Sequence, residues 1–269
     1  MPDPSHSTPS RPARGHAVRL SVPRRVVCDL LHFARRVPTV PVQRMIDVSS
    51  LVAARHFAQR RISWPALFTK AYAILSARTP ELRRAYVHYP WARLYEHPVP
   101  VASLAIEREY EGEAGVFFAY LAQPDEMPLA AVDAFLTRQR TEPVEDLFAY
   151  MFWIYRWFPR PARRLLWWYM LNVRGARKAE FAGTFGVSVY SSLGAESLHP
   201  LSPLTTTLNY GIIDDRGQVP VRIVYDHRVM DGSTVARALA RLEEILNGEV
   251  LAELRALPQV AGESRREAA

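Results

Sequence analysis

A histidine and an aspartate stand four residues apart near the C-terminal end of the chain, in the sequence YDHRVMDG at residues 225–232. Imidazole groups gain and lose protons near neutral pH, so His227 can accept a proton from a thiol, hydroxyl or amine that attacks an acyl carbonyl. Asp231 stands next to Gly232, a residue type that tolerates the unusual backbone angles of a strand-to-helix turn. The chemistry that this spacing offers is general-base catalysis of acyl transfer.

Each residue of this segment also has a structural interpretation. Asp231 is suited to cap the helix that follows, and His227 to end a strand with a hydrogen bond to the backbone. Taken singly, such residues are structural more often than catalytic. The complete pattern, at the junction of a strand and a helix, favours the catalytic interpretation.

The predicted elements place the segment between a strand and a helix. β-Branched and other apolar residues predict strands over residues 204–213 and 219–225, joined by a hairpin loop at residues 214–217. After Asp231, apolar residues at helical spacing predict an amphipathic helix that ends at Gly248. A histidine at the end of a strand is held by rigid backbone, so its ring can be aimed at a substrate with little reorganisation.

The rest of the chain predicts alternating helices and strands in one large domain. Helices are predicted from Pro23 and over residues 51–59, 64–77 and 129–138, and strands over residues 44–48, 98–107, 115–122 and 183–191. Residues 1–20 lack an apolar period and are predicted to be a disordered tail. Residues 21–257 form the predicted catalytic domain, and residues 258–269 a loose C-terminal tail.

The string DHRVMDG, which ends a predicted strand and opens an amphipathic helix, resembles the catalytic signature of the dihydrolipoamide acyltransferases of 2-oxo-acid dehydrogenase complexes. Those enzymes share their fold and a His-x-x-x-Asp-Gly core with chloramphenicol acetyltransferase. Two further segments, VPTVPVQRMIDVSSL and ALFTKAYAILSARTPELR, resemble the strand entry and the buried helix of the same family. With the motif, they extend the resemblance over residues 24–254.

The segment FGVSVYSSLG at residues 185–194 resembles the strand and turn in which this family places a Ser or Thr hydroxyl that donates a hydrogen bond to the tetrahedral oxyanion. A hydroxyl stabilises that charge without bringing a charge of its own into the pocket. Aligned on the closing SSLG, Ser191 takes this position, with Ser192 as the alternative in the neighbouring register. Both hydroxyls are also suited to cap the turn before Gly194.

The resemblance implies an α/β fold, a two-layer sandwich with a mixed sheet and helices on one side, of the chloramphenicol acetyltransferase type. It also implies a homotrimer in which the histidine of one chain faces the hydroxyl of the next. In the family, the motif aspartate pairs with an arginine of the N-terminal helix and organises the site together with the glycine that follows it. Here these residues are Asp231 and Gly232, and the spacing to Asp47 makes Arg25 the candidate arginine, with Arg24 as the alternative.

Dihydrolipoamide acyltransferases carry lipoyl and subunit-binding modules before the catalytic domain, and this sequence has no room for them. Neither Lys70 nor Lys178 lies in a lipoyl-like Asp-Lys turn. We therefore expect a stand-alone acyltransferase that takes an acyl group from acyl-CoA, or from an acyl-carrier or lipoyl protein, and passes it to a small-molecule acceptor. Thioester transfer requires deprotonation and oxyanion stabilisation, so no metal and no tightly bound cofactor is expected. His199 is not assigned to the site.

Two other functions remain open. One is an acyltransferase subunit that serves a 2-oxo-acid dehydrogenase complex in trans and moves acyl groups from lipoyl groups to CoA. The other is a non-catalytic, membrane-associated scaffold of the same fold. The intact His227 and Asp231 argue against the scaffold, which has no use for a histidine in this motif.

An aromatic segment at residues 145–175 departs from the family, in which a charged helix is expected at this place. Arginines and prolines interrupt the run of about 20 apolar residues that a transmembrane helix needs. An aromatic helical hairpin of two short helices, hinged at residues 159–161, is predicted instead. It is suited to three roles: a core or trimer contact, the lining of a pocket for a long acyl chain or an aromatic substrate, and contact with a membrane surface.

The chain has 269 residues, a formal charge of +7 and a pI near 9.7, values that often indicate nucleic-acid or anionic-membrane partners. Nearly all basic residues are arginines, scattered rather than gathered into one stripe, so no nucleic-acid partner is expected. The single cysteine, Cys28, excludes an intramolecular disulfide framework and a multi-cysteine metal site. No apolar signal region is visible, and we expect a cytoplasmic protein, with peripheral membrane contact as an alternative.

Overall fold

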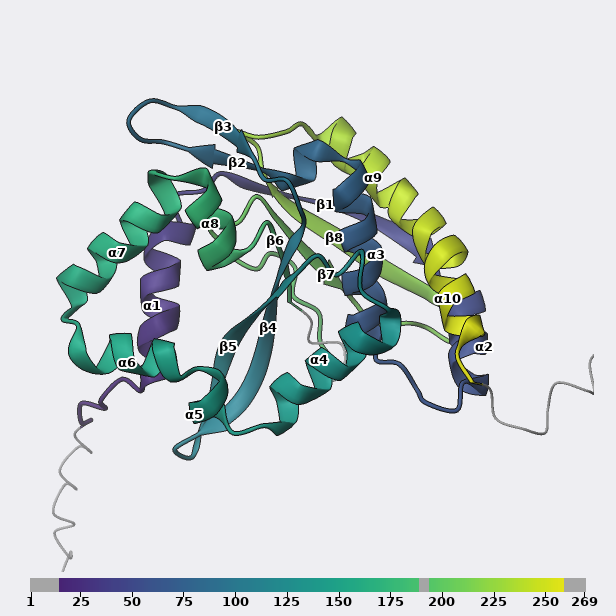
Figure 1. Ribbon diagram of the computed structural model, residues 1–269, viewed down its shortest axis with the longest axis horizontal. Coiled ribbons are helices and arrows are strands. Elements are labelled where there is room, and N and C mark those ends of the chain that lie inside the picture. The colour runs from purple at the N-terminus through teal and green to yellow at the C-terminus, as the bar shows by residue number, and fades with distance from the viewer. Residues whose placement is uncertain (1–14, 189–193, 259–269) are drawn as a thin grey trace, which may run out of the picture.

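A computed structural model describes residues 15–188 and 194–258, which form a six-stranded mixed sheet flanked by helices (Figure 1). In spatial order the strands are β1 (Thr39–Asp47), β8 (Gln218–Asp226), β7 (Thr206–Tyr210), β6 (Phe185–Val187), β4 (Val101–Tyr110) and β5 (Glu113–Ala122). β4, β6 and β7 are parallel, whereas β1, β8 and β5 pair antiparallel with their neighbours. β2 (Arg84–Val87) and β3 (Arg93–Glu96) form a separate hairpin. The predicted α/β class with a mixed sheet is confirmed.

One face of the sheet carries the main hydrophobic core under a layer of helices. They are α2 (Ser49–Phe57), α3 (Trp64–Arg78) with the following 3-10 turn η1 (Pro80–Arg83), α4 (Leu129–Thr141), α9 (Gly232–Ile245) and α10 (Leu251–Ala256). α3 lies between the sheet, α4 and α9, and every residue from Ala66 to Ser76 is buried. A helix surrounded in this way is apolar around its whole circumference, not only on the single face that the sequence predicted.

The C-terminal helix does not end at Gly248, so the predicted stop is wrong. α9 passes into a π-helical turn, η3 (Leu246–Val250), and continues as α10. The wider turn changes the helical register. Leu246, Val250 and Leu254 are all fully buried in this register. Their packing outweighs the low helix propensity of the glycine.

Two predicted strands have different bounds in the structure. β1 begins at Thr39, five residues earlier than predicted, and runs through Pro41. Proline is tolerated because β1 is an edge strand, where a missing N–H can face away from the ladder. β6 covers only three residues, Phe185–Val187, between the two longer strands β4 and β7.

A second group of helices lies on the side of β5 and of the β2–β3 hairpin (Figure 1). They are α1 (Val22–Ala34), α5 (Val144–Leu147), α6 (Ala149–Trp157), α7 (Arg160–Asn172) and α8 (Gly175–Ala182). α1 packs against β5 and is contacted by both α6 and α7, which meet at a bend around Pro159. Within the described residues, no helix has the length and the apolar composition to cross a membrane.

A buried ion pair ties α1 to α7. Asp29 is 1% exposed, and its carboxylate accepts a hydrogen bond from Nε of Arg163 (3.0 Å) and lies 3.5 Å from Nε of Arg164. The Arg163 guanidinium also lies 4.4 Å from the centre of the Tyr155 ring of α6. One carboxylate on α1 therefore holds the two arms of the helical bend in place.

We expect Asp29→Ala to lower the free energy of unfolding by about 3 kcal/mol or more, because removing one partner of a buried pair leaves the other charge uncompensated. Urea denaturation followed by circular dichroism measures the change. The matched control is Glu180→Ala, which breaks the exposed Arg177–Glu180 pair (2.8 Å) and should leave stability nearly unchanged. Equal stabilities for the two variants would contradict the role of Asp29.

Candidate active site

His227 lies in a tight turn that follows the last residue of β8. The backbone N–H of Asp226 donates to the carbonyl of Thr205 (2.8 Å), and the N–H of His227 donates to the carbonyl of Pro38 (3.1 Å). The N–H of Val229 closes the turn by donating to the carbonyl of Asp226 (3.0 Å). The histidine backbone is thus fixed from two directions, by the residues that lead into β7 and β1.

The two residues beside His227 form an ion pair that locks this turn. Asp226 is 1% exposed, and its carboxylate accepts hydrogen bonds from Nε (2.9 Å), Nη2 (2.7 Å) and the backbone N–H (3.0 Å) of Arg228. The Arg228 guanidinium lies 4.3 Å from the centre of the Tyr86 ring of β2. Charge-assisted bonds of this two-pronged kind fix geometry as well as adding energy. This role of Asp226 was not predicted from the sequence, although an acidic residue that ends an apolar strand was a visible signal.

Lys178 of α8 lies buried close to the ion pair. It is 5% exposed, and its Nζ donates to the carbonyl of Tyr86 (3.2 Å). Burial lowers the pKa of Lys178 from its usual 10.5 to about 8, against the opposing attraction of Asp226. No local pattern predicts this contact, because it joins segments far apart in the chain.

The side chains of His227 and Asp231 are largely exposed at the end of the sheet. Nδ1 of His227 lies 3.8 Å from Oδ1 of Asp231, and the side chains are 51% and 82% exposed. The carbonyl of Asp231 accepts from the N–H of Thr234 (3.0 Å), so its backbone begins α9. The alternative interpretation of the sequence was that the Asp231 side chain caps this helix. Within the described chain its carboxylate makes no such capping hydrogen bond. The carboxylate therefore remains available to the imidazole.

Tyr225 lies behind this pair and explains the glycine of the motif. Burial, and then the charge of Asp231, raises the pKa of Tyr225. A Cβ added at Gly232 would lie 3.3 Å from the Tyr225 hydroxyl. The sequence predicted unusual backbone angles at Gly232, but it is not among the described glycines with positive φ. Close packing against Tyr225 therefore explains why a glycine stands here.

The structure does not bring Arg25 to Asp231 within the described chain. Nη1 of Arg25 donates to the carbonyl of Tyr155 (3.1 Å), and Nε of Arg24 lies 3.8 Å from Glu113. The reason is the fold, because α1 packs at the β5 edge whereas Asp231 follows β8, next to the opposite edge strand β1. Both arginines serve contacts of α1.

The predicted oxyanion donor Ser191 and its alternative Ser192 lie outside the described residues. The last described residue before them is Ser188, whose N–H donates to the carbonyl of Leu208 (3.1 Å). It therefore lies at the end of β7 farther from the His227 turn. Ser188 is level with Asn209, which pairs with Arg222, five residues before His227. At 3.3 Å per residue, these five residues place His227 about 17 Å along the strand from the level of Ser188.

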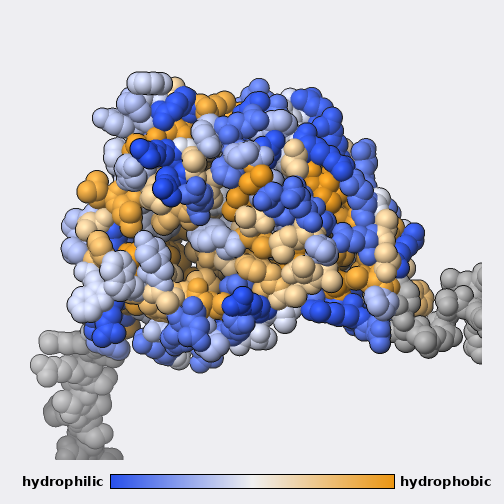
Figure 2. Space-filling view, in the orientation of Figure 1, coloured by the Kyte–Doolittle hydropathy of each residue, from blue (hydrophilic) through white to orange (hydrophobic). Residues whose placement is uncertain are grey.

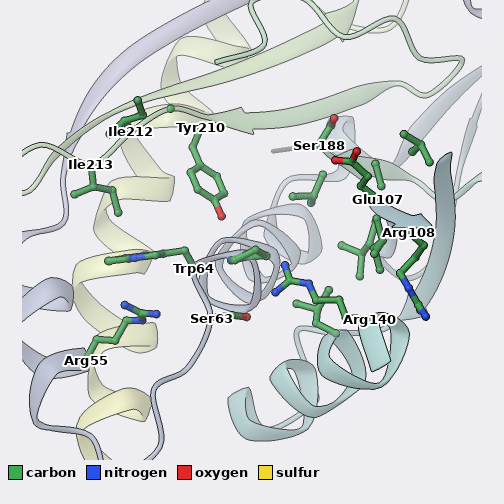
Figure 3. A pocket seen from close by; sticks show the side chains of 18 residues that line it. Arg55, Ser63, Trp64, Glu107, Arg108, Arg140, Ser188, Tyr210, Ile212 and Ile213 are labelled. Carbon is green, nitrogen blue, oxygen red and sulfur yellow. The ribbon is translucent and has the colours of Figure 1, made fainter. Parts of the chain in front are cut away.

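A cavity of about 740 Å³ opens at the Ser188 end of the sheet (Figure 3). Its walls include Arg55, Arg140, Trp64 and Tyr210, and we call it the arginine cavity. The Arg55 guanidinium lies 5.3 Å from the centre of the Trp64 ring. Figure 3 shows the Tyr210 hydroxyl and the Arg140 guanidinium directed into the cavity. Such a space favours a ligand that carries negative charge together with flat or apolar groups.

His199, which the sequence left out of the site, lies near the His227 turn. Its Nε2 is 2.7 Å from Oγ1 of Thr39, and Thr39 pairs with Asp226 across β1 and β8. No local pattern marks His199, because the contact depends on how the segment after Gly194 crosses the sheet. Among the described residues, no group of three or more His, Cys, Asp or Glu side chains could hold a metal ion.

Comparison with known proteins identifies the fold. No family model and no curated protein matches the sequence. A probable dihydrolipoamide acetyltransferase from Listeria monocytogenes superposes with a TM-score of 0.63 at 16% identity, over 87% of this chain and 94% of that chain. The dihydrolipoamide acetyltransferase of Azotobacter vinelandii gives 0.63 at 17% identity, over 91% and 96% of the two chains.

A third solved structure is a truncated catalytic core of the 2-oxoacid dehydrogenase multienzyme complex from Thermoplasma acidophilum. It superposes with a TM-score of 0.61 at 15% identity, over 87% of this chain and 99% of that chain. The chain therefore has the fold of dihydrolipoamide acyltransferase catalytic cores. The resemblance predicted from the DHRVMDG motif is confirmed at this level.

The lowered pKa of Lys178 predicts a pH dependence of stability. Between its folded pKa of about 8 and its usual value of 10.5, the unfolded chain binds more protons at this site. The free energy of unfolding should therefore rise with pH in this window. Measured by urea denaturation, the wild type should gain stability relative to Lys178→Met between pH 8 and pH 10. Parallel pH profiles for the two proteins would contradict the shift.

Proposed function

We propose that this protein is an acyltransferase that moves an acyl group from a thioester to a hydroxyl, amine or thiol of a small-molecule acceptor, with His227 as general base. The observation that carries the proposal is the exposed imidazole on a locked turn, with Nδ1 facing Asp231 at 3.8 Å. In the similar Azotobacter vinelandii enzyme, a serine, a histidine and an asparagine have been studied for their role in catalysis. The histidine and asparagine stand four residues apart there, as His227 and Asp231 do here.

The geometry supports a direct proton transfer. Because Nδ1 faces Asp231, Nε2 is the nitrogen that remains for the substrate. Nε2 takes the proton from the acceptor as its oxygen, nitrogen or sulfur attacks the acyl carbonyl. Ser191 donates a hydrogen bond to the oxyanion of the tetrahedral intermediate. The carbon–sulfur bond then breaks, and the leaving thiolate recovers the proton from the imidazolium.

The separation of the two halves of the site supports catalysis between subunits. His227 lies beyond one end of β7, and Ser188 lies level with Asn209 near the other end, about 17 Å away along the strand direction. In a homotrimer, the His227 end of one chain meets the Ser191 segment of the next. One similar solved structure is the cubic core of a pyruvate dehydrogenase complex, which is a multi-subunit assembly. The half-exposed imidazole fits a position that a neighbouring subunit completes.

The arginine cavity supports a thioester donor that carries phosphate groups, such as acyl-CoA or an acyl-carrier protein. Arginine guanidinium groups bind phosphates through paired hydrogen bonds, and Arg55 and Arg140 both line the cavity. The cavity lies beside Ser188, at the start of the proposed oxyanion segment. A donor bound there places its acyl group close to Ser188.

A second candidate function is acyl transfer from lipoyl groups to CoA, as a subunit that serves a 2-oxo-acid dehydrogenase complex in trans. The fold favours it, because the similar structures are cores of such enzymes. Assays with S-acyl dihydrolipoamide and free CoA separate the candidates. Transfer to CoA that far exceeds transfer to alcohols and amines would favour the second.

Replacing the proposed base should abolish most activity. We expect His227→Ala to lower acyl transfer by a factor on the order of 10² or more, because the acceptor then lacks its general base. Mass spectrometry of an acyl-CoA panel incubated with alcohols, amines and thiols measures the products. His56→Ala, which removes an exposed histidine of α2, is the control and should retain full activity. A folded His227→Ala variant with wild-type rates would favour a non-catalytic scaffold.

Mixing two inactive variants tests whether the site forms between subunits. Trimers assembled from equal amounts of His227→Ala and Ser191→Ala chains pair an intact His227 with a neighbouring intact Ser191 in about one quarter of their sites. We therefore expect recovery of about one quarter of the wild-type rate after co-refolding. No recovery, with mixed trimers present by native mass spectrometry, would place both residues of each site on one chain.

A further inference from the structure

A second hollow, of about 230 Å³, lies between α1 and the strands β4 and β5. Figure 2 shows the molecule hollowed between its α1 side and the sheet, with hydrophobic atoms in orange around the opening. None of the described residues that line the hollow carries a charge. Its principal walls are Val27 and Leu30 of α1, Phe118 and Tyr120 of β5, Trp167 of α7, and Leu204. We call this space the apolar hollow.

The apolar hollow meets the arginine cavity at the end of β6. Four residues line both spaces: Ala105, Val116, Val187 and Ser188. Ser188 is the last described residue before the segment that contains Ser191. A substrate whose charged carrier occupies the arginine cavity therefore has its thioester beside Ser188, and the rest of its acyl group can extend into the hollow.

The walls of the hollow are held in fixed positions by contacts outside it. The ring of Trp167 stacks on Phe33 of α1, with centroids 6.2 Å apart, and meets Phe181 edge-on at 4.9 Å. The buried pair of Asp29 and Arg163 ties the same two helices. α1 is therefore kept apart from the sheet without a ligand, as in most preformed small-molecule sites.

The hydroxyl of Tyr120 stands in a desolvated part of this space. Although Tyr120 is 43% exposed, it stands in a concave wall, and the loss of water around it raises the pKa of its hydroxyl to about 12. At the base, a Cβ added to Gly186 would lie 3.1 Å from Leu204 and 3.2 Å from Thr207, so these side chains close the hollow. Charged or heavily hydrated groups are disfavoured in such surroundings.

We propose that the apolar hollow binds the hydrocarbon chain of a medium-length acyl group, with the thioester carbonyl at the Ser188 end. A cavity of about 150 Å³ holds benzene, so the observed 230 Å³ holds about eight or nine carbons. The inference rests on the proposed acyl transfer and adds its substrate class. An alkyl chain needs no polar partner, whereas the phosphate groups of a nucleotide would meet no charged side chain among the described lining residues.

Filling the hollow tests this assignment. Val27 is partly exposed and lines the hollow, so the added ring of Val27→Phe occupies empty space. We expect the ratio of kcat/KM for octanoyl-CoA to that for acetyl-CoA to fall at least about tenfold. Val52→Phe, at a 41% exposed position of α2, is the matched control and should leave the ratio unchanged. Leu30→Ala lengthens the hollow and should move the preference toward longer chains.

Binding measurements without turnover test the acyl-chain site separately from the proposed acyl transfer. Calorimetry with octanoyl-CoA should give tighter binding than acetyl-CoA for the wild type, and this difference should be lost in Val27→Phe. If that pattern is found but no thioester is turned over, the acyl site stands and the proposed acyl transfer fails. If acetyl-CoA is transferred as well as octanoyl-CoA, and Val27→Phe changes neither ratio nor binding, the acyl site is overturned while acyl transfer stands.

Discussion

Asp226 is buried at the end of β8, and its charge is satisfied by a residue only two positions further along the chain. Since a buried carboxylate without partners is strongly unfavourable, Arg228 must fold back over it, and the backbone between them has to turn. His227 occupies the middle of that turn. The orientation of the imidazole thus follows from the burial of the Asp226 charge. The Arg228 guanidinium stacked on Tyr86 and the nearby Lys178 contribute to the surroundings of this buried charge. Asp231 adds orientation from the start of α9.

The same sheet that holds the histidine so firmly also keeps it away from the other half of the site. The His227 turn follows β8 and lies at one end of β7, whereas Ser188 follows β6 and lies near the other end of β7. The arginine cavity lies at the Ser188 end and offers guanidinium groups, whereas the uncharged apolar hollow extends from Ser188 along β6 to Leu204. The chain therefore presents His227, the proposed base, at one end of β7 and the proposed donor site, the arginine cavity, at the other. A homo-oligomer with closed rotational symmetry is the simplest arrangement that brings the His227 end of one chain to the Ser188 end of the next.

Local patterns predicted the elements well where the chain's own periodicity determines them. The strand into Tyr225, the helix after Asp231 and the break near Pro159 all follow from residues close in sequence. Contacts between distant segments could not be predicted in this way. The pairing proposed for Arg25 was based on its spacing to Asp47, which does not reveal that α1 packs against β5. The continuation through Gly248 depends on core packing that no local rule contains.

The distance between His227 and Ser188 has a consequence for how the reaction rate depends on protein concentration. If neither end of the sheet is sufficient, a folded but dissociated chain contributes nothing to the rate. Below the dissociation constant of the assembly, the rate would then rise more steeply than linearly with protein concentration, while spectroscopic signals of folding stay proportional to it. Dilution would therefore lower the activity per chain, although the fold of each chain stays unchanged.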